Sequence, residues 1–194
     1  MGKKKGNFFM GLLALSLVLG LLSGPVWADS SGVVTGKSAS AKLDFKINIP
    51  TILYLQVGSA AAQDTVSCTL ANTPSAGQYV PMLSNAEGAN VTVIMRAVVK
   101  QGDLCNLTAN SNGGLNSGLG SNIPSNKISW LGTKASGGGT ITSTNFDNTT
   151  TQSVGSVTGP GETRGSFAFS YLNDTYYPAD GDYTATVTYT LTAP

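Results

Sequence analysis

Apolar and polar residues alternate along several short stretches of the chain, and a period of two predicts β-strands. Leucine, phenylalanine and isoleucine occupy every second position over 43–49, before Pro50 ends the stretch. The alternation is most regular in the final stretch, GDYTATVTYTLTAP, which begins at Gly181. One face of this predicted strand carries the side chains of Tyr183, Ala185, Val187, Tyr189 and Leu191.

Shorter apolar stretches between these two predict further strands. Glycine-rich stretches that favour turns separate them, notably over 110–122, 135–140 and 158–165. No window after residue 28 combines a 3.6-residue apolar period with helix-forming residues. Many short strands joined by glycine-rich turns predict an all-β fold, a β-sandwich. The expected strands cover 52–57, 66–71, 90–100, 104–109, 127–132, 153–157 and 165–172.

The start of the chain has the layout of a secretory signal peptide. Three lysines precede an apolar stretch over 8–22, and small residues ending at Ala28 form a cleavage site. The apolar stretch is shorter than the ~20 residues that span a bilayer, so we expect no stable membrane insertion. Residues 1–28 are therefore expected to be removed on export, which leaves a polar extension over 29–42 and a β-domain over 43–194.

The polar extension carries a weak alternation of its own. This alternation continues in register into the stretch at 43–49, which favours an extended arm. The alternative interpretation is a flexible terminus. The alternating positions are Val33, Thr35, Lys37, Ala39 and Ala41.

Composition excludes several classes of function. Only 11% of the residues are charged and the net charge is +1, so no basic surface for nucleic acid is expected. The chain has no histidine, which removes the commonest general base and excludes Ser–His–Asp and Cys–His nucleophiles. Its ten acidic residues are scattered, mostly over predicted turns. We therefore expect no enzyme activity, no cofactor and no metal.

Cys68 and Cys105 are the only cysteines in the chain. A chain that passes through an oxidising compartment forms disulfides readily, so one intramolecular bond is the simplest expectation. Closing a loop of about 37 residues would stabilise the fold by ~3–4 kcal/mol.

The final predicted strand lacks the residues that usually protect an edge. An apolar alternating edge strand pairs readily with other chains, and proteins normally block such pairing with lysine or proline. The stretch from Gly181 to Ala193 contains neither, and its one charged residue is Asp182. Either another strand of the same domain covers this edge, or the edge serves to pair with a strand from elsewhere.

Taken together, these features resemble the subunits of chaperone–usher fimbriae, the pilin family. The features are an exported domain of this size, one cysteine pair, a polar N-terminal arm and a terminal alternating strand that opens with glycine. In that family a glycine lies fourteen residues from the C-terminus, the place that Gly181 occupies. The resemblance implies an immunoglobulin-like sandwich that lacks its last strand, which a periplasmic chaperone and then the N-terminal arm of the next subunit supply.

The resemblance also implies roles and partners. The strand from Tyr183 to Leu191 would flank the missing strand, a Cys68–Cys105 disulfide would hold the early strands together, and Val33 to Ala41 would be the donor arm. The expected function is a structural subunit of a cell-surface fimbria, with a role in adhesion or biofilm formation. Its expected partners are copies of itself or sister pilins, a periplasmic chaperone and an outer-membrane usher.

A monomeric secreted binding module with a complete sandwich, such as an adhesin or a carbohydrate-binding domain, is the alternative. Aromatic side chains can line a sugar-binding face, although packing is their more ordinary role. The candidates for such a face are Tyr54, Tyr79, Trp130, Tyr176 and Tyr177.

Overall fold

The structure is a computed structural model, and it describes residues 42–60, 63–70, 77–147, 151–179 and 181–194. The predicted signal peptide and the predicted donor-arm positions over 33–41 lie outside these ranges. The described residues fall into two units, one that ends at Ile49 and one that spans Pro50–Pro194. None of the described residues forms a helix long and apolar enough to cross a membrane.

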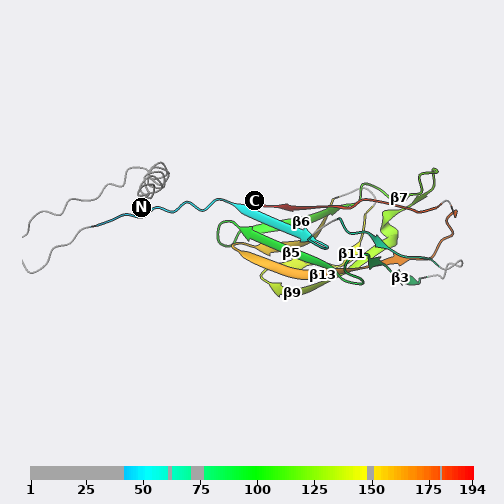
Figure 1. The fold of residues 1–194 in the computed structure, drawn as a ribbon, viewed down its shortest axis with the longest axis horizontal. Coiled ribbons are helices and arrows are strands. Elements are labelled where there is room, and N and C mark those ends of the chain that lie inside the picture. Colours follow the sequence, from blue (N-terminus) through cyan, green and yellow to red (C-terminus); the bar gives the residue numbers. More distant parts are fainter. Residues whose placement is uncertain (1–41, 61–62, 71–76, 148–150, 180) are drawn as a thin grey trace, which may run out of the picture. The chain divides into compact units, whose positions relative to one another are not determined.

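Two antiparallel sheets make up the unit from Pro50 to Pro194 (Figure 1). Their strands are β1 (Ile52–Val57), β3 (Tyr79–Pro81), β5 (Val91–Val98), β6 (Leu104–Asn110), β9 (Ile128–Gly137), β10 (Thr140–Ile141), β11 (Thr144–Asn145), β12 (Gln152–Thr158), β13 (Gly161–Leu172) and β14 (Thr188–Thr192). The larger sheet has the order β1-β5-β13-β9-β11, and β3 pairs with the end of β13, beyond the part that pairs with β5. The smaller sheet has the order β10-β12-β6-β14.

Two small strand pairs and one helical turn complete the described elements. The strand β2 (Val66–Ser67) pairs with β4 (Leu83–Ser84), and β7 (Leu115–Asn116) pairs with β8 (Asn122–Ile123). A single 3-10 turn covers Ser125–Lys127. The described residues therefore form an all-β fold, as the alternation and the glycine-rich turns predicted.

Both sheets contribute side chains to one hydrophobic core. Alternate residues of β5 are buried in it, as a strand with one core-facing side requires. From β13, the predicted face of Phe167, Phe169 and Tyr171 is buried as well. The ring of Phe167 lies 6.0–6.2 Å from the rings of Trp130, Phe169 and Tyr189. This aromatic cluster joins strands of the two sheets, because Phe167 belongs to the larger sheet and Tyr189 to the smaller.

Three of the predicted strands differ from the structure. Of the stretch predicted at 66–71, only Val66–Ser67 is a strand among the described residues. The stretch at 43–49 is not a paired strand, because residues 42–49 have no regular structure and are exposed throughout. The final strand is also shorter than predicted, since β14 covers only Thr188–Thr192. The reason is its partner: β6 ends at Asn110, which lies opposite Thr188, so the pairing with β6 stops there. Before this point the described residues of this segment form a bridge only at Thr184, to Asn116 of β7.

Two glycines at the turn between β9 and β10, Gly137 and Gly139, lie against backbone. A Cβ atom on Gly139 would lie 1.8 Å from the carbonyl oxygen of Ser156, which is far inside van der Waals contact. The N–H of Gly139 donates a hydrogen bond of 3.0 Å to the Oγ1 of the buried Thr163. The neighbouring Gly138 has room, since its Cβ would lie 3.7 Å from the Cβ of Thr158.

We expect Gly139→Ala to lower the free energy of unfolding by about 2 kcal/mol or more, because the new methyl group forces β10 away from β12. Gly138→Ala is the matched control and should change it by less than ~1 kcal/mol. Urea unfolding followed by the fluorescence of the buried Trp130 measures both. Equal effects of the two substitutions would contradict the close approach at Gly139.

Candidate functional site

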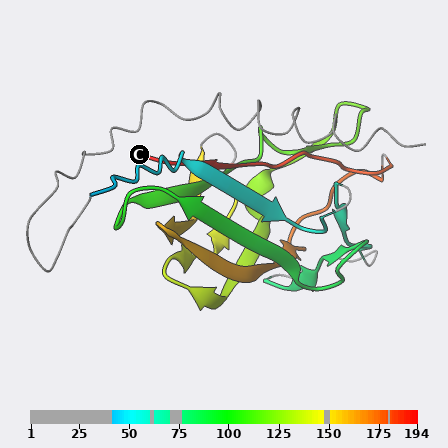
Figure 2. The ribbon, with the colours of Figure 1, turned by 60° about the vertical axis from the view of Figure 1, so that its left-hand side comes forward.

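The two sheets leave one side of the sandwich with unpaired backbone. Among the described residues, β1 pairs only with β5, and β14 pairs only with β6. These two strands lie close together, one from each sheet (Figure 2). An edge strand points half of its N–H and C=O groups away from its single partner. We call the unpaired sides of β1 and β14, taken together, the open edge.

Side chains along the open edge face the core but are not fully covered. Residues opposite each other in an antiparallel ladder share a face, so Leu53, Leu55 and Val57 of β1 lie on the same side as Ala97, Met95 and Val93. The three residues of β5 are 0–1% exposed, whereas Leu55 and Val57 are half-buried and Leu53 is 36% exposed.

The smaller sheet shows the same contrast. Leu191 lies opposite Leu107, and Tyr189 lies opposite Ala109. The two residues of β6 are buried, while Tyr189 and Leu191 are half-buried and pack against the core. Burial of its phenol nevertheless raises the pKa of Tyr189. The core is therefore closed over β5 and β6 and incompletely covered along β1 and β14.

The other edges of the two sheets are protected in ordinary ways. The strands β10 and β11 are two residues long and β3 is three, and short edge strands resist pairing with other chains. The exposed part of β9 carries Lys134, whose Nζ donates to the carbonyl oxygens of Gly137 and Gly139. The strands β1 and β14 are six and five residues long and contain no charge and no proline. The open edge is thus the one long pair of edges in the described fold without such protection.

A cross-strand set of side chains on the outer face fastens β1 to the sheet. Tyr54 lies opposite Arg96, which lies opposite Glu162. The guanidinium of Arg96 sits 5.2 Å from the centre of the Tyr54 ring and forms an ion pair with Glu162. Arg164 forms a second ion pair with the same carboxylate. Hydrogen bonds from Arg164 and Arg96 lower the pKa of Glu162 below its ordinary value.

A lowered carboxyl pKa stabilises the fold above the ordinary pKa of the group, and this stabilisation is lost as the pH falls through the lowered value. We therefore expect Glu162→Gln to lower the thermal midpoint at pH 7 and to have a shrinking effect as the pH falls below 4.5. Differential scanning fluorimetry of both proteins from pH 7 to pH 3 measures this. A difference that stays constant over that range would show that the ion pairs do not act through the charge of Glu162.

The residues predicted for the strand that flanks the missing one, from Gly181 to Leu191, lie in three different settings. Tyr189 and Leu191 lie on β14, where the prediction placed them. Tyr183 and Val187 pack against the core but lie outside β14. Ala185 is exposed, and Gly181 adopts a positive φ of 94° at a bend.

Two contacts hold the segment before β14 in place. The hydroxyl of Tyr183 donates to the carbonyl oxygen of Pro178 at 2.8 Å. The backbone of Thr184 exchanges two hydrogen bonds with Asn116 at 2.8 and 3.0 Å. The segment is therefore anchored to the fold although it is not a continuous strand.

The segment from Leu43 to Ile49 was expected to be a strand, and it is described here by itself. Its apolar side chains alternate, and all four are exposed: Phe45 is 85% and Ile47 84% exposed. Large apolar side chains exposed to this extent in a row usually mark an interaction site. The alternation was visible in the sequence, but it predicted a strand of the chain's own sandwich.

The predicted disulfide between Cys68 and Cys105 is absent, because both cysteines are free thiols in the structure. Cys105 lies opposite Val157, beside the turn that leads into the start of β13. Cys68 follows β2 and lies near Tyr171, towards the other end of β13. Ten residues of strand separate Gly161 from Tyr171, so the two thiols are on the order of 20 Å or more apart, whereas a disulfide needs Cα atoms within about 7 Å.

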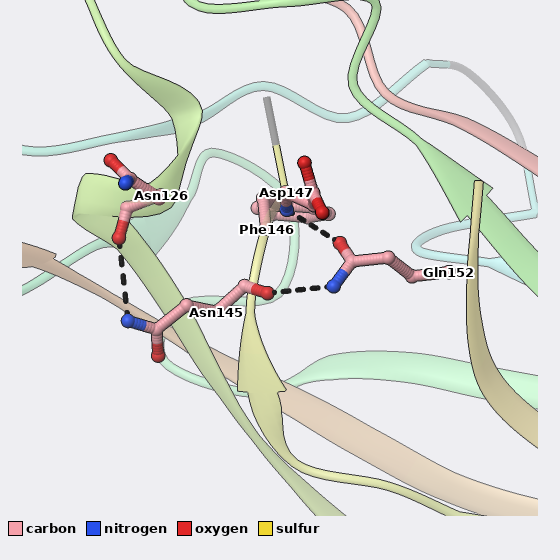
Figure 3. A pocket seen from close by; sticks show the side chains of 5 residues that line it. All are labelled: Asn126, Asn145, Phe146, Asp147 and Gln152. Carbon is pink, nitrogen blue, oxygen red and sulfur yellow. Dashed lines mark hydrogen bonds between the residues drawn. The ribbon is translucent and has the colours of Figure 1, made fainter. Parts of the chain in front are cut away.

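A hollow of about 350 Å³ lies beside β11, lined by Asn126, Asn145, Phe146, Asp147 and Gln152 (Figure 3). Hydrogen bonds to the backbone occupy the side-chain amides of Gln152 and Asn145. Gln152 donates to the carbonyl oxygen of Asn145 and accepts from the N–H of Asp147, at 3.0 and 2.7 Å. Asn145 donates to the carbonyl oxygen of Asn126 at 3.3 Å. These groups hold the chain after β11 in place.

The five aromatic residues considered for a sugar-binding face do not lie together on one face, although Tyr176 is 76% exposed. Trp130 is 3% exposed and Tyr177 packs against the core. Tyr54 is aligned with Glu162 on β13, whereas Tyr79 pairs with Leu172. Ten residues along a strand correspond to about 33 Å, so these two tyrosines lie at opposite ends of the sheet.

No group of histidine, cysteine, aspartate and glutamate side chains in the described part of the chain is arranged to hold a metal ion. Comparisons of the chain with protein-family models, with curated proteins and with solved structures found no match.

Proposed function

We propose that the protein is a structural subunit that joins to other copies of itself by strand addition. The segment from Leu43 to Ile49 of one copy would pair along the open edge of another. The observation that carries this proposal is the match between two incomplete surfaces: a segment with four exposed apolar side chains and a sandwich edge whose core-facing side chains are half-covered.

The chemistry of the two surfaces is complementary. A strand places alternate side chains on one face, so Leu43, Phe45, Ile47 and Ile49 would together face the core. Asp44, Lys46 and Asn48 would face solvent. Burying a large apolar side chain stabilises by ~1.5–3 kcal/mol, so four of them contribute up to ~6–12 kcal/mol. The backbone of the segment would also satisfy the free N–H and C=O groups of β1 and β14.

This proposal agrees with the resemblance to fimbrial subunits and changes the residues that would donate the strand. The resemblance assigned the donor arm to 33–41, where the apolar side chains are small. The stretch at 43–49 has four large ones and lies outside the compact unit that begins at Pro50. We propose that this stretch forms the donor strand, within an immunoglobulin-like sandwich that lacks one strand.

The exposed surfaces also support the proposed partners. A subunit with an open edge and an exposed apolar segment would aggregate unless another protein covered it before assembly. A periplasmic chaperone that lends a strand, and an outer-membrane usher that orders the exchange, would meet this need. The assembled fibre would lie at the cell surface and act in adhesion or biofilm formation.

Replacing Phe45 and Ile47 together by aspartate tests the donor segment. We expect the exported double variant to remain monomeric, because two buried charges cost more than the remaining apolar contacts provide. The matched control changes Asp44 and Lys46, on the other face, to serine and should polymerise like the native chain. Light scattering and electron microscopy measure polymer length.

Mixing the double variant with the native chain distinguishes strand donation from other modes of association. The donor-deficient variant keeps its own open edge, so we expect it to join one end of a growing fibre and stop further addition there. Equal amounts of variant and native chain should therefore give shorter fibres. Native-length fibres in the mixture, or fibres made by the double variant alone, would contradict strand donation by 43–49.

A further inference from the structure

We propose that the connection of Pro50 and Thr51 prevents the segment from Leu43 to Ile49 from closing the open edge of its own chain. This inference rests on the proposed function and names the partner of the same site: the strand has to come from a second copy. The connection is only two residues long, since Ile49 ends the segment and Ile52 begins β1. Three constraints follow from this length, from the residue types and from the directions of the edge strands.

The first constraint is the face that the side chains would occupy. If the segment turned back through the two-residue connection, Ile49 would pair with Ile52, and Ile47 with Tyr54. Opposite residues share a face in an antiparallel pair. Tyr54 faces outward, where it contacts Arg96, and the core-facing positions of β1 are Leu53, Leu55 and Val57. The apolar side chains would thus point to solvent.

The second constraint is the chemistry of the turn. Two-residue hairpin turns need a positive φ at their first central residue, and the ring of Pro50 fixes φ near −65°. A three-residue turn would bring Ile49 opposite Leu53 and turn the apolar face inward. That turn usually places its third residue, here Ile52, in the left-handed region, which a β-branched side chain strongly disfavours.

Longer turns can also point the apolar side chains of the segment towards the core, but they break contacts that are present in the structure. A five-residue turn from Pro50 to Tyr54 would unpair half of β1 and lose the contact of Tyr54 with Arg96. A five-residue turn from Asn48 to Ile52 would take Ile49 out of the set of core-facing apolar side chains and break the pairing of Ile52 with Val98. Both five-residue turns therefore lose stabilising contacts in the segment, in β1 or in both.

The third constraint is direction. Both ribbon views show the C-terminal end of β14 beside the start of β1, so the two edge strands run in opposite directions (Figures 1 and 2). A segment that turns back from β1 would run parallel to β14. Parallel pairs are slightly less stable than antiparallel ones. A segment from a second copy is free of all three constraints, because it can enter in either direction and in any register.

Lengthening the connection tests this inference. We would insert twelve glycine and serine residues between Ile49 and Pro50, which give a root-mean-square reach of about 17–21 Å. This matches the ~17 Å length of a five-residue strand such as β14, so the segment can enter its own open edge from either end. The matched control carries the same insertion between Lys42 and Leu43 and leaves the connection of Pro50 and Thr51 unchanged.

We expect the insertion after Ile49 to give monomers, with at least tenfold less polymer than the native chain at micromolar concentration, because a tethered strand has an effective concentration near millimolar. Its thermal midpoint should exceed that of the monomeric Phe45→Asp/Ile47→Asp variant. Adding these two substitutions to the insertion should remove the gain. The insertion before Leu43 should polymerise like the native chain.

The possible failures are distinguishable. If the insertion after Ile49 polymerises as well as the native chain, the connection does not prevent self-closure, and the proposed function stands without this inference. If the native chain itself forms no polymers and Phe45→Asp/Ile47→Asp lowers no thermal midpoint in the insertion variant, the segment has no affinity for the open edge. Both the inference and the proposed function then fail.

Discussion

A strand buried in a sandwich needs a hydrogen-bonded neighbour on each side, and the whole arrangement of this protein depends on where that requirement is unmet. The central strands β5, β6 and β13 have two neighbours and contribute the side chains of lowest exposure. The strands β1 and β14 have one neighbour each among the described residues, and their core-facing side chains are only half-buried. Unpaired backbone and incomplete burial occur at the same place because one added strand would correct both.

The fold class could be predicted from the sequence because a two-residue period is a local property. The strand β1 was predicted to the residue, and the buried face of Phe167, Phe169 and Tyr171 followed from alternation alone. The length of β14 could not be predicted in this way. It is set by the end of β6 at Asn110, a residue 78 positions earlier that no local pattern links to Thr188.

The candidate site was predicted in part, for the same reason. The unprotected final strand was visible in the sequence, and Tyr189 and Leu191 lie on the open edge. The alternation at 43–49 was visible too, but alternation says that a segment has an apolar face and not which molecule covers it. The presence of two cysteines did not predict whether they form a disulfide. Whether Cys68 and Cys105 can meet depends on the length of β13 between them.

The short connection between Ile49 and β1 also has a mechanical consequence for a fibre built in this way. A pull along the fibre would pass from the donated segment through Pro50 and Thr51 directly into the start of β1. The force would then act along the strand, at right angles to its hydrogen bonds with β5. The six residue pairs from Ile52–Val98 to Val57–Val93 would be loaded together in shear and not one after another. Tension would thus be shared across the ladder that the contact of Tyr54 with Arg96 reinforces.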